Sequence, residues 1–305
     1  MPSDVIFLTG ATGYLGSHIL NQLLAKGYHV KVAIREKKAS QFKQLYESHQ
    51  SQLEVVIIDD ISTSQFPEAL KGVKAIIHTA APLAYAVSDA EGQLKGAVEG
   101  ALNVLRQAEK AGVHKVVLTS TILTAFTPQF TFTTDGTQNE GVTAYMAAKT
   151  LAEKEVWNFA DTHSQMDITT INPPYLYGPG TKEFTTYLTA PSTTLISTLI
   201  NIYKLLNPNG AYPDYPLYID VRDVAKAHIV LNEKRPELKD RLTKTTPPEF
   251  PFKKLAYDSK RVEEICGLKP EDFVPVNDTF VESVDTLVAL ENQWKAAGYE
   301  LPAPQ

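Results

Sequence analysis

Apolar runs of strand length alternate with amphipathic stretches along residues 1–171 of the chain. Several of these runs are continuous and β-branched, which is typical of strands buried on both faces of a parallel sheet. Between them, apolar residues recur at helical spacing. This alternation predicts an α/β fold with a doubly wound parallel Rossmann sheet and right-handed crossovers. We expect strands at residues 5–9, 28–34, 53–58, 75–78, 115–119 and 168–171, and helices at 17–27, 38–50, 66–71, 87–111 and 142–163.

A glycine-rich turn follows the first predicted strand, with the spacing Gly10-x-x-Gly13-x-x-Gly16. A turn without side chains lets the backbone approach a diphosphate. The N-terminus of the next helix offers unpaired N–H groups and the positive end of its dipole to that anion. The strand before the turn and the helix after it are the context that such a motif requires. We therefore predict a dinucleotide site with contacts from Gly10, Thr12, Gly13, Tyr14, Leu15 and Gly16.

The pattern changes after Asn172, where proline, glycine, tyrosine and threonine become frequent. One helical stretch lies near 192–206, and we expect a short strand at 217–219 and a helix at 221–232 that return to the main sheet. Asp278 and Thr279 predict the cap of the last helix. The predicted division is a dinucleotide-binding Rossmann domain of residues 1–173 plus 217–235 and a smaller C-terminal substrate lobe of residues 174–216 plus 236–305.

The residues after the second strand bear on which dinucleotide binds. NAD sites usually carry an acid there, which bonds the ribose 2′-hydroxyl. This chain has Arg35, followed by Lys37 and Lys38, and a guanidinium matches a 2′-phosphate in charge and geometry. We therefore predict NADPH/NADP+ with Arg35 and Lys38 as contacts; the alternative is that Arg35 is a solvated surface charge. Asp60 and Ile61, after the third strand, are predicted to meet the adenine, and the alternative is an ordinary strand-end turn.

Tyr145 and Lys149 form the candidate catalytic pair. They are four residues apart in a predicted helix, so they share one face. A neighbouring ammonium favours the phenolate and is expected to lower the tyrosine pKa toward use in proton transfer. The hydroxyls of Thr119, Ser120 and Thr121 end the fifth strand and are expected to face the same crevice. One of them would hold a substrate carbonyl oxygen beside the tyrosine.

These residues resemble the extended short-chain dehydrogenase/reductases. The resemblance is to the branch of dihydroflavonol reductases and fungal NADPH-dependent aldehyde, ketone and methylglyoxal reductases. It covers nearly the whole chain and rests on the glycine turn, His78-Thr79-Ala80-Ala81-Pro82, Val98-Glu99-Gly100-Ala101-Leu102-Asn103-Val104-Leu105, Tyr145-x-x-x-Lys149, Asn172-Pro173-Pro174-Tyr175-Leu176-Tyr177-Gly178-Pro179 and Tyr218-Ile219-Asp220-Val221-Arg222-Asp223-Val224-Ala225.

The resemblance implies a role for each matching residue. Tyr145 would give its proton to the carbonyl oxygen, and Lys149 would bond the nicotinamide ribose and lower the tyrosine pKa. The family carries a serine at the position of Thr121; because threonine keeps the hydroxyl but restricts its rotation, Ser120 remains an alternative. Further cofactor contacts are expected at Thr79, Ala80, Ala81, Thr119, Pro173 and Leu176.

The candidate substrate wall is apolar and aromatic, which selects shape more than hydrogen-bond pattern. The residues expected to form it are Leu83, Tyr85, Leu123, Phe126, Tyr175 and Tyr218. Such a wall suits a carbonyl compound better than a sugar nucleotide. The resemblance thus implies an NADPH-dependent carbonyl reductase. The alternatives are a sugar-nucleotide epimerase or dehydratase on the same scaffold and a non-enzymatic dinucleotide sensor, which would lack a working tyrosine–lysine pair.

Composition narrows the class of protein. The 305 residues carry a net charge of −6, which argues against nucleic acid as the main partner. Cys266 is the one cysteine, so neither an internal disulfide nor a cysteine-built metal site is expected. The first strand starts within a few residues of Met1, leaving no room for a signal peptide, and no apolar run approaches the ~18 residues of a membrane helix. We expect a cytoplasmic monomer or homodimer that takes a small carbonyl substrate and no membrane partner.

Overall fold

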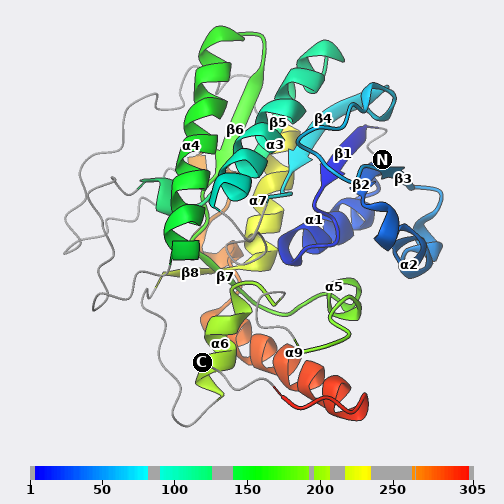
Figure 1. Cartoon of the computed structure of the whole chain (residues 1–305), viewed down its shortest axis with the longest axis vertical. Helices are drawn as coiled ribbons and strands as arrows, with labels where there is room; N and C mark the ends of the chain where they lie inside the picture. Colours follow the sequence, from blue (N-terminus) through cyan, green and yellow to red (C-terminus); the bar gives the residue numbers. More distant parts are fainter. Residues whose placement is uncertain are drawn as a thin grey trace.

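The structure is a computed structural model that describes residues 4–81, 90–125, 140–191, 196–206, 217–234, 263–264 and 266–301. Its centre is a sheet of six parallel strands in the order β3-β2-β1-β4-β5-β6 (Figure 1). The predicted Rossmann sheet is therefore confirmed. The strands are β1 (Val5–Thr9), β2 (His29–Ile34), β3 (Leu53–Ile57), β4 (Val73–His78), β5 (Lys115–Thr119) and β6 (Asp167–Ile171).

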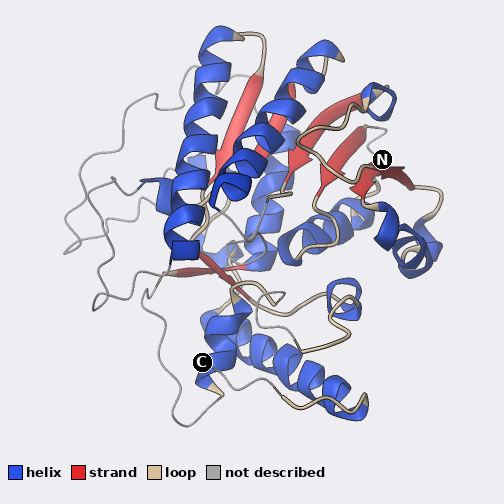
Figure 2. Ribbon diagram, viewed as in Figure 1, coloured by secondary structure: helices blue, strands red, loops and turns tan. Residues whose placement is uncertain are grey.

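Helices cover both faces of this sheet (Figure 2). On one face α3 (Ala90–Lys110) packs against α4 (Glu140–Thr162), and on the other α1 (Tyr14–Ala25) packs against α7 (Val221–Lys234). α2 (Glu36–Leu45) lies beside β3. The described 3-10 turns are η1 (Glu47–His49), η2 (Pro67–Leu70), η3 (Ile122–Ala125) and η5 (Pro270–Asp272).

The apolar runs of the strands follow from this double cover. Successive side chains of a strand point to opposite faces, and in β1 both faces are buried. Ile6 and Leu8 pack in the cluster that contains α1 and α7 side chains. Phe7 points to the other face, where its ring lies 5.5 Å from that of Phe66. β1 is therefore apolar from Val5 to Leu8 without alternation.

A second, two-stranded parallel sheet begins the C-terminal part, formed by β7 (Tyr175–Tyr177) and β8 (Tyr218–Asp220). The strand expected at 217–219 thus pairs with β7 and not with the six-stranded sheet, whereas α7, which follows it, packs on α1, β5 and β6. The remaining described helices are α5 (Lys182–Thr186), α6 (Leu199–Leu205) and α9 (Val276–Ala296). In Figure 1 these three helices lie beyond β7 and β8.

The last helix begins earlier than its predicted cap. α9 starts at Val276 after Pro275, so the prediction that Asp278 and Thr279 cap it was wrong. Thr279 is buried, and its hydroxyl donates to Asp220 at 2.8 Å. Asp220 also accepts from Arg222, whose guanidinium reaches Glu282 at 2.6 Å. Tertiary contacts therefore occupy the residue that a local capping rule assigns to the helix end.

The C-terminal part docks on α1, the helix that follows the glycine turn. The Tyr14 hydroxyl donates to Gly178 O at 2.6 Å, and His18 Nε2 donates to Pro179 O at 2.8 Å. Asn21 Nδ2 donates to Glu183 at 3.0 Å. These bonds hold the C-terminal part beside the carboxyl edge of the sheet, where ligands of open α/β folds bind.

Candidate active site

The glycine turn is shaped by close backbone packing. Gly10 has a φ of +79°, and a Cβ there would lie 2.3 Å from Thr79 Oγ1. A Cβ on Gly16 would lie 2.1 Å from Gly10 O, so α1 starts directly against the turn. Gly13 is the N-cap of α1, no side chain of the described residues caps this helix, and its first turn holds no acid. The amides at the start of α1 therefore suit an anion such as a diphosphate.

Three cationic residues gather where β2 meets α2. Arg35 is the N-cap of α2, and Lys37 and Lys38 follow it. Lys38 Nζ donates to Thr12 Oγ1 at 3.3 Å and lies 4.5 Å from the centre of the Tyr187 ring. Burial, together with the charges of Arg35 and Lys37, lowers the pKa of Lys38. No carboxylate of the described residues forms an ion pair with these cations, so their charge is available to an anion beside the glycine turn.

The turn after β3 engages the side chain of Asp60. Its carboxylate accepts from Ser62 N at 2.9 Å and from Thr63 Oγ1 at 2.9 Å. These bonds form a strand-end turn, which was the alternative to an adenine contact. Ile61 O accepts from Asn103 Nδ2 of α3 at 2.8 Å. The adenine contacts of both residues remain predictions.

Asp59 is a residue of this region that the sequence analysis missed. Its carboxylate accepts from Glu36 N at 2.8 Å and so ties the end of β3 to the start of α2, next to Arg35. An acid at the end of the apolar run of residues 53–58 was the available signal.

Lys149 is buried on α4 and faces the end of β5. Its Nζ donates to Thr119 O at 2.9 Å, and Lys149 is 8% exposed. Burial lowers the pKa of Lys149 to about 8, and the carboxylate of Glu153 opposes that shift. Tyr145 lies one turn earlier on the same helix face. Its pKa is raised to about 12 by burial, so the expected lowering by Lys149 is not found in this structure. At neutral pH Tyr145 is therefore a phenol and holds a proton that it can donate.

The three hydroxyls at the end of β5 bond to different partners, although Thr119 and Ser120 both line one pocket; that all three face the same crevice stays a prediction. Thr119 Oγ1 donates to His228 Nε2 at 2.7 Å; His228 Nδ1 donates to Val224 O, which leaves Nε2 as the acceptor. The Ser120 hydroxyl donates to the carboxylate of Glu153. The physical reason is that neighbouring residues of a strand leave it on opposite faces.

Thr121 differs from its two neighbours. Its Oγ1 accepts from Leu123 N at 3.3 Å, and within the described residues its hydroxyl proton has no acceptor. Thr121 therefore keeps a donor for a ligand, whereas Ser120 is committed to Glu153. This difference favours Thr121 over Ser120 as the working hydroxyl.

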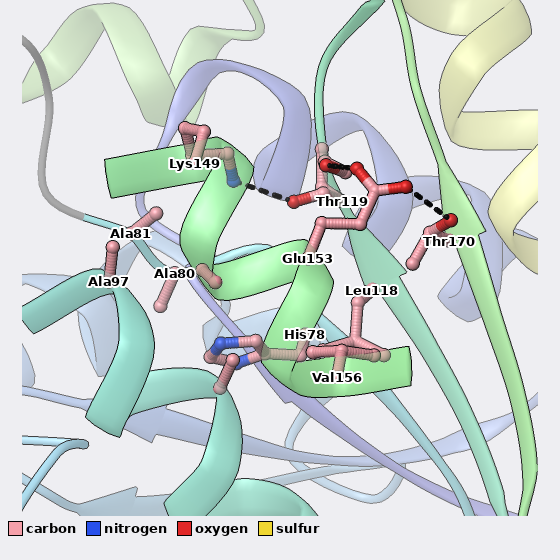
Figure 3. Close-up of a pocket in the computed structure, with 13 residues that line it drawn as sticks. His78, Ala80, Ala81, Ala97, Leu118, Thr119, Lys149, Glu153, Val156 and Thr170 are labelled. Atoms are coloured by element: carbon pink, nitrogen blue, oxygen red, sulfur yellow. Dashed lines mark hydrogen bonds between the residues drawn. The ribbon is translucent and has the colours of Figure 1, made fainter. Parts of the chain in front are cut away.

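A pocket lies between α3, α4 and the carboxyl ends of β4 and β5 (Figure 3). Figure 3 shows Lys149 and Glu153 leaving α4 toward Thr119 and Thr170. His78 Nδ1 on β4 forms a hydrogen bond with Thr9 Oγ1 at 2.8 Å, and burial followed by the charge of Lys149 lowers the pKa of His78 to about 3. The pocket is lined by His78, Ala80, Ala81, Ala97, Ala101, Leu118, Thr119, Ser120, Lys149, Ala152, Glu153, Val156 and Thr170.

The remaining predicted cofactor contacts lie around the strand ends. The Thr79 hydroxyl donates to Thr9 O at 2.8 Å and joins β4 to β1. Pro173 is buried, and its carbonyl accepts from Ile122 N at 3.0 Å. Leu176 is partly exposed on β7, and its carbonyl accepts from the Thr198 hydroxyl. These positions agree with a ligand at the carboxyl edge, and their contacts to it remain predictions.

Part of the predicted substrate wall lies outside the described residues, namely Leu83, Tyr85 and Phe126. Leu123 lies in η3 and is partly exposed. Tyr175 and Tyr218 lie opposite each other on β7 and β8. The Tyr218 ring is 5.0 Å from that of Phe280 on α9, so it also packs in the aromatic core of the C-terminal part.

The described part of the chain contains neither a metal-binding cluster nor a membrane-spanning helix. No group of three or more histidine, cysteine, aspartate or glutamate side chains there is arranged to hold a metal ion. None of the described helices is both long and apolar enough to cross a membrane.

Known proteins resemble this chain in sequence and in fold. The profile of the NAD dependent epimerase/dehydratase family matches residues 6–241. The NADPH-dependent methylglyoxal reductase of Saccharomyces cerevisiae is 30% identical over 78% of this chain and 76% of its own length. A ketoreductase of Aspergillus niger is 30% identical over 90% of this chain and 85% of its own.

Solved structures agree with these matches. The crystal structure of Gre2 from Candida albicans in complex with NADPH is 25% identical and superposes with a TM-score of 0.72 over 94% of this chain and 99% of that one. The chain belongs to the NAD dependent epimerase/dehydratase family, the extended short-chain dehydrogenase/reductases, and is close to the Gre2-type methylglyoxal reductases.

Proposed function

We propose that this protein is an NADPH-dependent carbonyl reductase that acts on an aldehyde or a ketone. The observation that carries the proposal is the pair on α4: a protonated Tyr145 one turn before a buried Lys149, at the same sheet edge as the glycine turn. Its relatives from Saccharomyces cerevisiae and Aspergillus niger are named as a methylglyoxal reductase and a ketoreductase. That similarity supports carbonyl reduction over epimerisation.

The chain offers a fitting cradle for NADPH. The uncapped amides of α1 would hold the diphosphate, and Arg35 with Lys38 would pair with the 2′-phosphate. Lys149 would bond the nicotinamide ribose. The bound cofactor supplies the hydride.

The protein's own groups handle the proton. Burial keeps Tyr145 in its phenol form, so its O–H can donate to the carbonyl oxygen as that oxygen gains negative charge. Thr121 has a hydroxyl proton that is free of acceptors in the described residues and can hold the same oxygen. Lys149, with a pKa of about 8, is largely charged at neutral pH, and its ammonium would stabilise the phenolate that forms on Tyr145 once the proton has left.

Replacing Tyr145 tests this proposal. Tyr145→Phe should lower kcat by roughly 100- to 10,000-fold, the range for a lost general acid, while NADPH still binds. The measurement is NADPH oxidation with aliphatic, aromatic, dicarbonyl and keto-ester substrates, beside fluorescence titration of NADPH. Tyr299→Phe, at an exposed position near the end of the described chain, is the matched control. Full turnover by Tyr145→Phe would refute the assignment, and a cofactor retained through purification without carbonyl turnover would favour an epimerase.

A further inference from the structure

Glu153 is a carboxylate in the pocket wall for which the proposed mechanism has no role. It lies one turn after Lys149, so Tyr145, Lys149 and Glu153 follow one another at four-residue spacing along the same face of α4. This spacing was the sequence signal that we missed. In Figure 3 Glu153 lies next to Lys149 and points at the strand ends.

The carboxylate of Glu153 receives donors from two strands. The Ser120 hydroxyl donates from the end of β5. Thr170 Oγ1 donates from β6 at 3.4 Å, and Asn172 Nδ2, just after β6, lies 2.8 and 3.0 Å from the two oxygens. All of these partners are donors, and an ionised carboxylate is the side chain that accepts at both oxygens. Bonds to a charged acceptor are also stronger than neutral ones.

The bonds continue from Glu153 to the candidate catalytic groups. The Asn172 amide nitrogen also lies 3.3 Å from Thr121 O and 2.9 Å from Thr124 Oγ1, so its two hydrogens are shared between these acceptors and Glu153. Ser120 N donates to Ile171 O at 2.7 Å, which extends the pairing of β5 and β6. Thr119 O, the acceptor of Lys149, lies one residue before Ser120. A shift of the Glu153 carboxylate would therefore move Thr121 and the Lys149 acceptor together.

We infer that Glu153 is a positioning residue. Its carboxylate holds the ends of β5 and β6 against α4 and so fixes Thr121 and Thr119 O relative to Tyr145 and Lys149. The inference rests on the proposed function for its effect on turnover, but the contacts that it describes do not depend on any substrate. Its charge also faces Lys149, and the other titratable groups beside Lys149 in the described residues are His78 on β4 and Tyr145, one turn earlier on α4.

The test replaces the carboxylate and keeps its size. In Glu153→Gln one of the two oxygens becomes an NH2 group, which accepts no hydrogen bond. Ser120 and Asn172 donate to one carboxylate oxygen, and Thr170 and Asn172 to the other, so one of these two sets of donors loses its acceptor. We expect kcat to fall by about 100-fold, the order expected when reacting groups are misaligned, with the affinity for NADPH unchanged. Because the negative charge that supports the Lys149 ammonium is lost, the decline of activity above about pH 8 should move to lower pH.

Two further variants and a second measurement complete the experiment. Glu153→Asp keeps the charge and should recover the pH profile of the wild type, but its shorter reach leaves kcat reduced. Glu155→Gln, on the same helix, removes a carboxylate that pairs with Asn158 and should behave as wild type. Amide hydrogen exchange of residues 118–125 should be faster in Glu153→Gln than in either the wild type or Glu155→Gln.

Each outcome decides the inference. Wild-type kcat or wild-type amide protection in Glu153→Gln overturns it, and so does an equal loss of kcat and NADPH affinity, which would indicate general damage to the fold. An inactive wild type refutes the proposed function instead, and hydrogen exchange then still decides whether Glu153 holds the strand ends.

Discussion

The hydroxyl side chains of Thr119 and Ser120, at the end of β5, have different partners because they point to opposite faces of the sheet. Thr119 sends its hydroxyl to His228 of α7, and Ser120 sends its own to Glu153 of α4. Lys149 consequently meets the carbonyl of Thr119 and not its hydroxyl. Three adjacent hydroxyls in the sequence are thus three different groups in the fold, and among the partners that the structure describes Thr121 alone has no acceptor for its hydroxyl proton.

At this scale the cofactor preference depends on Arg35. Arg35→Ala should weaken NADPH binding relative to NADH by roughly 10- to 100-fold, since it removes a charge-assisted bond to the 2′-phosphate. The measurement is the ratio of the two dissociation constants, determined by fluorescence titration. Arg106→Ala, which removes an exposed arginine paired with Glu99, is the control. A wild type that prefers NADH would contradict the predicted cofactor.

At the scale of elements, the two parts of the chain meet beside the predicted 2′-phosphate site. Lys38 comes from α2, and Tyr187, whose ring lies under its ammonium, directly follows α5 of the C-terminal part. The same part bonds to α1 through Tyr14 and His18. The C-terminal part thus contacts both elements that we propose to hold the phosphates.

Two substitutions at Tyr187 distinguish the contribution of its ring to NADPH binding from that of its hydroxyl. Tyr187→Leu removes the cation–π contact and should lower the NADPH-to-NADH affinity ratio by about 5-fold, which corresponds to about 1 kcal/mol. Tyr187→Phe keeps the ring. Its loss of the hydroxyl should not matter, because that oxygen is buried without a partner in the described residues. Equal ratios in the two variants would show that the ring does not position Lys38.

At the scale of the whole molecule, buried histidines link folding to pH. His78 and His228 are buried at the sheet, and burial lowers their pKa values to about 3 and about 4 from an ordinary value of 6.5. Below pH 6.5 these two histidines bind protons in the unfolded chain but stay neutral in the folded protein. Stability is therefore full above about pH 6.5 and falls as the pH approaches 4.

The expected loss is about 3 kcal/mol for each of these histidines by pH 4. Urea unfolding at pH 7, 5.5 and 4 measures it. His228→Gln should be less stable than the wild type at pH 7, because its bonds to Thr119 and Val224 are changed, but its stability should fall less steeply with acid. His29→Gln, at an exposed position, is the control. A slope for His228→Gln equal to that of the wild type would contradict the assignment.

Much of the fold and part of the site were predictable from the sequence. Strands with helices on both faces carry nearly continuous apolar runs, so their pattern predicted the parallel sheet. The glycine spacing predicted the turn whose Gly10 has a positive φ, and four-residue spacing placed Tyr145 and Lys149 on one helix face. The start of α9 was mispredicted, because Thr279 bonds to Asp220 in the fold and does not cap its own helix.

The sequence by itself determined the six strands of the main sheet, their succession with helices along the chain and the presence of a tyrosine–lysine pair, because these follow from contacts within a few residues along the chain. It did not predict β7 or α5. Only the tertiary structure decided that Ser120 binds Glu153, that β8 pairs with β7 and that Lys38 lies over Tyr187. It also decided that burial raises the pKa of Tyr145. The physical reason is that hydrogen-bond partners and desolvation depend on which distant segments pack together. The local periodicity of the sequence does not determine that packing.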